Sequence, residues 1–174
     1  MNTEITVKSE KIFEGKIINL RVDTVELEKQ KYTKREIVEH RNAVAIVAIN
    51  ENGEILLVKQ FRKAVEDFLF ELPAGILNIA EVPVEGALRE LKEETGYEAK
   101  KIKQVCEFYS SPGFTNEKIY LFKAEDLLFA STKLDEDECI ETIAVNKEEA
   151  AKMLETGRIL DSKTIIGILH WINS

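Results

Sequence analysis

Residues 75–97 read GILNIAEVPVEGALRELKEETGY, a glycine-led turn followed by a stretch with helical periodicity. The apolar positions of this stretch fall on one helical face and predict a stripe that packs against a core. The stripe consists of Val84, Ala87, Leu88 and Leu91. Pro83 suits the first turn of this helix, because the missing N–H of proline leaves no hydrogen bond unmade there.

Carboxylates flank the apolar stripe of the predicted helix. Glu90 and Glu94 are one turn apart, and Glu93 lies further around the same flank. Neighbouring carboxylates on a helix repel each other by about 0.2–0.5 kcal/mol per exposed pair, and a bound cation removes this cost. Clusters of carboxylate oxygens are typical of sites for hard divalent cations, which also bind phosphate. The alternative interpretation is a solvated acidic face that Arg89 and Lys92 balance.

The same spacing of glycine, glutamate, Arg-Glu and Glu-Glu defines the signature of the Nudix hydrolases, which this stretch resembles. The matching residues are Gly75, Glu81, Arg89, Glu90, Leu91, Glu93, Glu94, Gly96 and Tyr97. The resemblance covers essentially the whole chain and is strongest to the bacterial ADP-ribose pyrophosphatases. It extends beyond the signature through KIFEGKIINL, KQFRKAVED, ELPAG, LDEDE and Pro112, which lies 16 positions after Gly96.

Two positions depart from the pattern. Ala80 stands where the family usually has glycine, so the turn that starts at Gly75 is expected to differ in shape. Gly86 interrupts the helix at a cost of about 1 kcal/mol relative to alanine, and a close approach of another segment would account for it.

The resemblance implies an α/β Nudix fold, in which a mixed β-sheet is sandwiched between helices, with an N-terminal antiparallel β arm. It divides the chain into that arm, residues 1–41, and a Nudix catalytic domain, residues 42–174. Local patterns predict strands at residues 16–28 (kinked near 23–24), 35–40, 43–49, 55–58, 68–72, 105–109, 119–123 and 140–145. Residues 50–54 are expected to form a tight hairpin turn, and Asn146 and Asp161 are expected to cap two further helices.

The resemblance also implies a divalent-metal site. Mg²⁺ or Mn²⁺ is expected to bind the backbone carbonyl of Ala74 and the carboxylates of Glu90, Glu94 and Glu138. Glu93 is expected either to ligate the metal or to hold a bridging water, and Arg89 to orient a glutamate. For Glu81, a ligand role and a hydrogen bond back to the turn both remain open.

The acidic segment LDEDE, residues 134–138, matches a family loop that closes over the site. By this match Glu136 is the catalytic base toward the attacking water, with Glu138 and Glu117 as alternatives. A solvated turn is the other interpretation of the segment. A calcium loop is disfavoured, because its ligand spacing and central glycine are absent.

Substrate contacts are likewise implied by the resemblance. Arg62 matches the family arginine that grips a substrate phosphate, a task that suits a planar guanidinium. Arg35 and Glu36 match the part of the arm that reaches the adenosine end, with a strand-edge ion pair as the alternative for Arg35. Pro112 and Gly113 belong to the turn that marks the ADP-ribose branch.

The implied reaction is metal-dependent hydrolysis of the pyrophosphate bond of ADP-ribose, or of a similar nucleoside diphosphate sugar, to AMP and ribose 5-phosphate. GDP-mannose and dinucleotides are alternative substrates within the same chemistry. A non-catalytic nucleotide-sensing Nudix module and a plain acidic interaction domain are alternatives from other classes. The first usually loses signature carboxylates, which this chain retains, and the second leaves the signature unexplained.

Composition limits the partners. The chain has 174 residues and a net charge of −8, which disfavours nucleic acid and anionic membrane surfaces. No apolar run is long enough to span a membrane, and the first residues, MNTEITVKSEK, lack the apolar segment of a signal peptide. A cytoplasmic location is therefore expected. The arm has too few apolar residues to stand alone, so we expect it to lie against the main domain or to form a homodimer.

Overall fold

The computed structural model describes residues 3–130 and 140–174. Contacts between backbone positions divide the chain into two units, residues 1–42 with 108–118, and residues 43–107 with 119–174. The first unit ends next to the boundary expected at residue 41. However, residues 108–118 group with the arm, although they connect two long strands that run mainly through the second unit.

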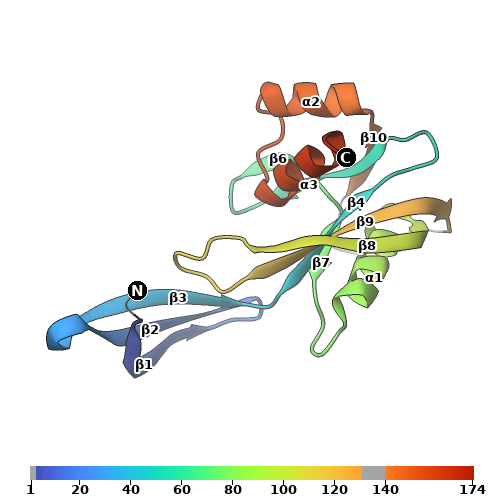
Figure 1. Cartoon of the computed structure of the whole chain (residues 1–174). Helices are drawn as coiled ribbons and strands as arrows, with labels where there is room; N and C mark the ends of the chain where they lie inside the picture. The colour runs from blue at the N-terminus through green and yellow to red at the C-terminus, as the bar shows by residue number, and fades with distance from the viewer. Residues whose placement is uncertain (1–2, 131–139) are drawn as a thin grey trace. The chain divides into compact units, whose positions relative to one another are not determined.

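The first unit is built on a three-stranded antiparallel sheet in the order β1-β2-β3 (Figure 1). Its elements are β1 (Ile5–Glu14), β2 (Ile18–Leu27), a 3₁₀ turn (Glu28–Gln30) and β3 (Lys31–His40). The expected kink near Asp23 is absent between β2 and β3, whose register is continuous over all ten positions. The irregularities lie instead between β1 and β2, at Thr6/Lys8 and Lys11/Phe13.

In residues 43–107, 119–130 and 140–174, the second unit forms two sheets and three helices. Its elements are β4 (Ala43–Ala48), β5 (Ile55–Arg62), β6 (Asp67–Glu71), β7 (Ala74–Ile76), α1 (Pro83–Thr95), β8 (Tyr97–Tyr109), β9 (Lys118–Phe129), β10 (Glu141–Val145), α2 (Lys147–Glu155) and α3 (Ser162–Ile172). One sheet has the order β7-β4-β9-β8 and is mixed, because β4 pairs with β9 in parallel and with β7 antiparallel. The other sheet, β10-β5-β6, is antiparallel.

Helices cover both faces of the mixed sheet at strand β4 (Figure 1). Side chains of a strand alternate between its two faces. Val44 and Ile46 therefore point to one face, where they pack in a buried cluster with Leu91 of α1. Val47 points to the other face, where a Cβ built on Gly167 of α3 would lie 2.9 Å from its Cγ2 atom. This arrangement confirms the expected sandwich of a mixed sheet between helices.

The turn at residues 50–54 forms as expected, but it does not join a hairpin ladder. The Asn50 N–H donates to the Glu54 carbonyl at 2.9 Å, and Gly53 adopts a φ of 75°. Yet β4 and β5 belong to different sheets, and the pairing across the turn is one isolated bridge between Ile49, which follows β4, and Ile55. On one edge β4 pairs with β9 over Ala43–Ala48, and on the other edge it pairs with β7 over Ala43–Ala45, whereas β5 pairs with β10 and β6.

Both predicted helix caps are confirmed. The Asn146 side chain accepts from the Glu149 N–H at 2.9 Å, and the Asp161 side chain accepts from the Thr164 N–H at 3.0 Å. Within the described part of the chain, no helix is both long and apolar enough to cross a membrane.

Candidate active site

The carboxylates of the signature are presented by α1, whose ends and buried face fix its rotation. The helix begins at Pro83 and ends at Gly96, which adopts the left-handed conformation and donates its N–H to the Lys92 carbonyl. Ala87 and Leu91 are completely buried and anchor the helix on the mixed sheet. The flank that carries the acidic residues is therefore held at one orientation.

Arg89 is the centre of the ion-pair cluster on this flank. Its guanidinium donates to both carboxylate oxygens of Glu81, at 2.8 and 2.9 Å, to Glu90 at 2.7 Å and to Glu93 at 2.9 Å. It also donates to the carbonyl of Ile76 at 3.3 Å. One arginine thus holds three carboxylates.

Glu81 bonds back to the turn. Its Oε2 atom accepts from the Asn78 N–H at 2.7 Å, and the side chain accepts two bonds from Arg89. The hydrogen bond from Arg89, followed by the bond from Asn78, lowers the pKa of Glu81 to about 2. The preceding residue, Ala80, adopts a φ of 62° at the position where the family usually has glycine.

Gly75 is required by the close approach of Glu90. A Cβ built on Gly75 would lie 2.0 Å from the Glu90 Cδ atom and 2.1 Å from its Oε1 atom, so a larger residue would displace this carboxylate. Gly86 has a similar explanation, because its Cβ would lie 2.4 Å from a methyl group of Leu77. The interruption of the helix is therefore explained by the packing of α1 against Leu77.

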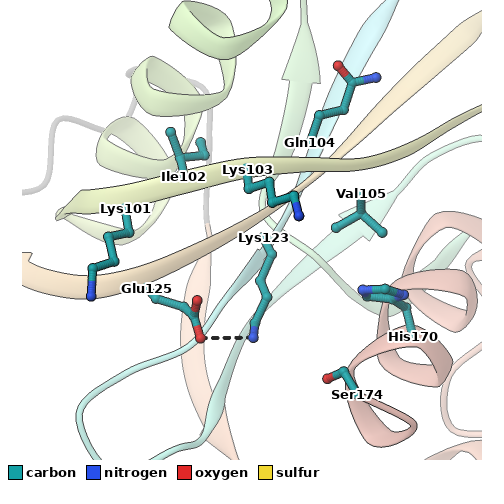
Figure 2. Close-up of a pocket in the computed structure, with 9 residues that line it drawn as sticks. All are labelled: Lys101, Ile102, Lys103, Gln104, Val105, Lys123, Glu125, His170 and Ser174. Atoms are coloured by element: carbon teal, nitrogen blue, oxygen red, sulfur yellow. Dashed lines mark ion pairs between the residues drawn. The ribbon is translucent and has the colours of Figure 1, made fainter.

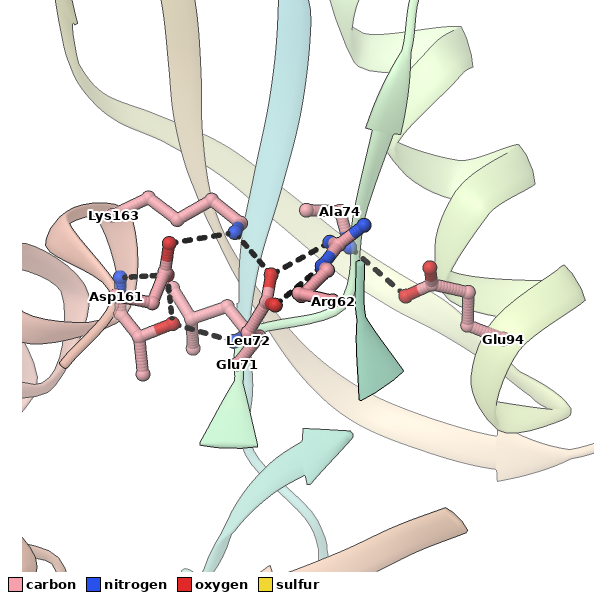
Figure 3. Close-up of polar contacts among 8 residues, drawn as sticks. Arg62, Glu71, Leu72, Ala74, Glu94, Asp161 and Lys163 are labelled. Carbon is pink, nitrogen blue, oxygen red and sulfur yellow. Dashed lines mark hydrogen bonds and ion pairs between the residues drawn. The ribbon is translucent and has the colours of Figure 1, made fainter. Parts of the chain in front are cut away.

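Glu94 is buried, with only 5% of its surface exposed, and it lies against the same short strand as Glu90. Its Oε2 atom accepts from the Ala74 N–H at 2.9 Å (Figure 3). Glu90 and Glu94 therefore converge on the neighbouring residues Gly75 and Ala74 of β7. This places two carboxylates and one main-chain segment together.

Arg62 lies at the end of β5 and forms a bidentate ion pair with Glu71 of β6 (Figure 3). The two N···O distances are 2.6 and 2.7 Å. Glu71 is almost completely buried, and Lys163 of α3 donates to the same carboxylate. Burial by itself would raise the pKa of Glu71, but the bonds from Arg62 and Lys163 outweigh it and hold the pKa below its ordinary value.

The donors gathered around β7 fit a hard divalent cation. Carboxylate and carbonyl oxygens are the ligands that Mg²⁺ and Mn²⁺ prefer, and Glu90, Glu94 and Ala74 supply them. Within residues 3–130 and 140–174, no three His, Cys, Asp or Glu side chains converge closely enough to hold a metal ion by themselves. The expected additional ligand, Glu138, lies outside the described residues, as does the expected base Glu136.

The remaining predicted substrate residues belong to the first unit. Arg35 and Glu36 lie on β3 and are exposed. The guanidinium of Arg35 pairs with Glu4, with an Nε···O distance of 3.0 Å, so the strand-edge ion pair is present. Pro112 and Gly113 are exposed in a tight turn.

That turn is held by β3. The Val38 N–H donates to the Phe114 carbonyl at 2.8 Å, and the His40 N–H donates to the Asn116 side chain at 2.9 Å. Glu117, the alternative base, lies 3.2 Å from the Nδ1 atom of His40. These contacts explain why residues 108–118 group with the arm.

Sequence reasoning missed two members of the polar cluster around Arg62. Glu71 is the first residue of the ELPAG segment, which carried the resemblance, but nothing local indicated its partner. Lys163 lies 92 positions further along the chain, and no spacing rule relates residues so far apart.

A pocket of about 470 Å³ lies elsewhere in the second unit, between β8, β9 and the end of α3 (Figure 2). Lys101, Lys103, Lys123 and His170 are among its lining residues. Lys123 pairs with Glu125 at 2.8 Å, and Lys101 pairs with Asp126 at the same distance. Since carboxylates neutralise two of the three lysines, we assign this pocket no ligand.

Comparison with known proteins agrees with the geometry of this site. The family model described as NUDIX domain matches residues 39–165. The chain is 48% identical over 169 residues to an ADP-ribose pyrophosphatase of Bacillus subtilis, covering 96% of this chain and 91% of that protein. It is 44% identical, with the same coverage, to a methanol dehydrogenase activator of Bacillus methanolicus.

A crystal structure of an ADP compounds hydrolase has the same fold. Its TM-score is 0.88 at 20% sequence identity, and the match covers 98% of this chain and 94% of that one. Together with the helix that carries Glu90 and Glu94, the match over residues 39–165 leads to one conclusion. The chain belongs to the NUDIX domain family.

Proposed function

We propose that the protein hydrolyses the pyrophosphate bond of ADP-ribose to AMP and ribose 5-phosphate, with a divalent metal ion, Mg²⁺ or Mn²⁺, as cofactor. The observation that carries this proposal is that Glu90 and Glu94 of α1 converge on β7. Arg89 of the same helix donates to Glu90. The identity of 48% to an ADP-ribose pyrophosphatase supports the choice of substrate.

Glu90, Glu94, Glu138 and the carbonyl of Ala74 hold the metal in this proposal. When bound, the metal neutralises charge on the diphosphate and lowers the pKa of a coordinated water. Arg89 orients Glu90 and Glu93, because its guanidinium donates to both carboxylates. Glu93 ligates the metal or holds a water beside it.

The protein contributes positioning and charge rather than a covalent intermediate. Arg62 offers its guanidinium to a substrate phosphate, and 42% of its side-chain surface is exposed for that purpose. Arg35, Glu36, Pro112 and Gly113 contact the substrate from the first unit or from its copy in a second chain. Glu136 takes the proton from the attacking water, with Glu138 and Glu117 as the alternatives.

The first unit is the proposed homodimer contact. Every residue of β1 is exposed, and four of its large apolar side chains are at least half exposed. These are Ile5, Val7, Ile12 and Phe13. Exposed apolar side chains gathered on one strand are typical of a contact surface. Sedimentation of the full chain at micromolar concentration tests this proposal, and a fully active monomer would reject it.

A substrate panel tests the proposed reaction. Purified protein is incubated with ADP-ribose, GDP-mannose and a dinucleoside diphosphate, with Mg²⁺, with Mn²⁺ and with a chelator, and the products are separated by chromatography. We expect AMP from ADP-ribose only when metal is present. A preference for GDP-mannose would make that compound the substrate in place of ADP-ribose. No turnover with any compound would favour a nucleotide-sensing module. The relative from Bacillus methanolicus makes activation of a methanol dehydrogenase a second candidate function, which the same protein can be assayed for directly.

A further inference from the structure

The four-residue link Glu71–Ala74, which runs from the last residue of β6 to the first residue of β7, carries two groups that the proposed function uses. The carboxylate of Glu71 holds the guanidinium of Arg62 in a bidentate pair. The carbonyl of Ala74 is a proposed metal ligand, and the Ala74 N–H bonds to Glu94. The conformation of this link therefore sets both the phosphate-binding guanidinium and one oxygen of the metal site.

The middle of the link is held by the first turn of α3. The Leu72 N–H donates to the hydroxyl of Thr164 at 2.8 Å, and Thr164 is completely buried. The hydroxyl in turn donates to the carboxylate of Asp161, the residue that caps α3. Because the single proton of the hydroxyl is donated to Asp161, its oxygen presents a lone pair to the Leu72 N–H.

The packing of α3 leaves the link no room to move toward the helix. A Cβ on Gly167 would lie 2.5 Å from a methyl group of Leu72 and 2.9 Å from Val47. On the other side, the Ile46 N–H donates to the Pro73 carbonyl at 2.9 Å. The link is thus clamped between α3 and β4.

Lys163, next to Thr164, acts on the first residue of the link. Its ammonium group donates to Glu71 and lies 3.0 Å from Asp161. Lys163 is largely buried, so this charge is poorly screened by water. Glu71 therefore shares its negative charge between Lys163 and Arg62, and Arg62 keeps part of its attraction for another anion.

We propose that the first turn of α3 positions the diphosphate and metal site, with Thr164 holding the β6–β7 link and Lys163 balancing the charge of Glu71. This proposal rests on the proposed function, since it takes Arg62 as the phosphate contact and Ala74 as a metal ligand. Thr164 and Lys163 are positioning residues, because neither side chain contacts the reacting atoms.

The first experiment, on Thr164 variants, measures metal binding as well as turnover. Thr164→Val removes the acceptor of the Leu72 N–H and keeps the side-chain shape. We expect Mg²⁺ affinity, measured by calorimetry, and kcat to fall by about 10- to 100-fold, the usual cost of removing an outer partner of a metal site. Thr164→Ser keeps the hydroxyl and should restore both. The control is Thr156→Val after α2, which removes a hydroxyl that donates to the main-chain carbonyl of Lys152, at 2.7 Å, away from the link.

The second experiment, on Lys163 variants, is expected to change KM and to leave metal binding unchanged. In Lys163→Met, Arg62 becomes the main counter-charge of Glu71, so its attraction for a substrate phosphate falls. We expect KM for ADP-ribose to rise by about five- to tenfold, within the contribution of one charge-assisted hydrogen bond. Mg²⁺ affinity should stay unchanged. Lys163→Arg keeps the charge and should restore KM, and Lys152→Met on the exposed side of α2 is the control.

The proposal would be overturned by equal Mg²⁺ affinity in Thr164→Val and Thr164→Ser, or by an unchanged KM in Lys163→Met. Lys163→Met leaves the main-chain bonds of the link in place, so it tests the proposal even if Thr164→Val does not fold. If the wild type does not hydrolyse ADP-ribose, the proposed function fails instead. In that case calorimetry with Mg²⁺ still decides the role of Thr164.

Discussion

Gly75→Ala would place a methyl group where the carboxylate of Glu90 now lies. The added Cβ would be 2.0 Å from the Glu90 Cδ atom, whereas ordinary contacts begin at 3.4 Å. The carboxylate must therefore move by at least 1.4 Å, the difference between these two distances. The backbone cannot yield easily, because Gly75 is paired with Val44 in the sheet and its neighbour Ala74 is bonded to Glu94.

The size of the effect follows from that displacement. A misplacement of about 1 Å costs roughly 10²-fold in rate, so we expect kcat/KM for ADP-ribose to fall by at least about 100-fold. This factor corresponds to about 2.7 kcal/mol of transition-state stabilisation. Overpacking costs about 1–3 kcal/mol of folding stability, which lowers Tm by about 2–12 °C in a chain of this length.

The assay is AMP release at saturating Mg²⁺, at a temperature where circular dichroism shows that the variant is folded. Gly86→Ala is the matched control on α1, because its methyl group would meet the flexible end of Leu77 at 2.4 Å and, at 3.3 Å, Glu81, which is not among the proposed metal ligands. We expect the control to change Tm but to keep kcat/KM within a few-fold of wild type. Equal losses in both variants, or wild-type turnover in Gly75→Ala, would refute the assignment of Glu90 to the metal site.

Three further predictions concern single carboxylates. Glu94→Gln should keep the bond from Ala74 but abolish nearly all turnover and weaken Mg²⁺ binding in calorimetry. Retention of more than about a tenth of the activity would contradict metal ligation, because the loss of transition-state stabilisation would then be under about 1.4 kcal/mol. Glu136→Gln should lower kcat far more than it raises KM, and a normal kcat would return the role of base to Glu138 or Glu117. Because the folded pKa of Glu81 is about 2, below the ordinary 4.5, its ion pair with Arg89 stabilises the metal-free protein above pH 4.5 and is lost as pH falls toward 2. Urea unfolding in chelator should therefore show Glu81→Gln less stable than wild type at neutral pH, with a difference that shrinks through that range; a constant difference would contradict the shift.

Much of the site was predictable because its residues lie close together in the sequence. Glu90, Glu93, Glu94 and Arg89 share one helix, and helical periodicity places them on one flank without knowledge of the rest of the chain. The caps at Asn146 and Asp161 were predictable for the same reason, since a cap depends on a side chain and the N–H three positions later.

Other parts of the fold were not accessible from local patterns. The short strand β7, only three residues long, has no periodicity to detect, and in β1 the apolar alternation is confined to Ile5 and Val7 before polar residues follow. The assignment of β4 and β5 to different sheets was missed, because a turn sequence specifies a reversal of the chain but not which strand edges remain free for pairing.

The sequence alone indicated the family resemblance, the mixed β-sheet between helices, and the acidic helix with its expected chemistry. These depend on residue type at fixed spacing. Only the tertiary structure showed that Arg62 is held by Glu71 and Lys163, and that Glu90 and Glu94 meet at Gly75 and Ala74. These contacts join segments far apart in the chain, and their distances depend on how β6, β7, α1 and α3 pack. Side-chain spacing within one element carries no information about that packing.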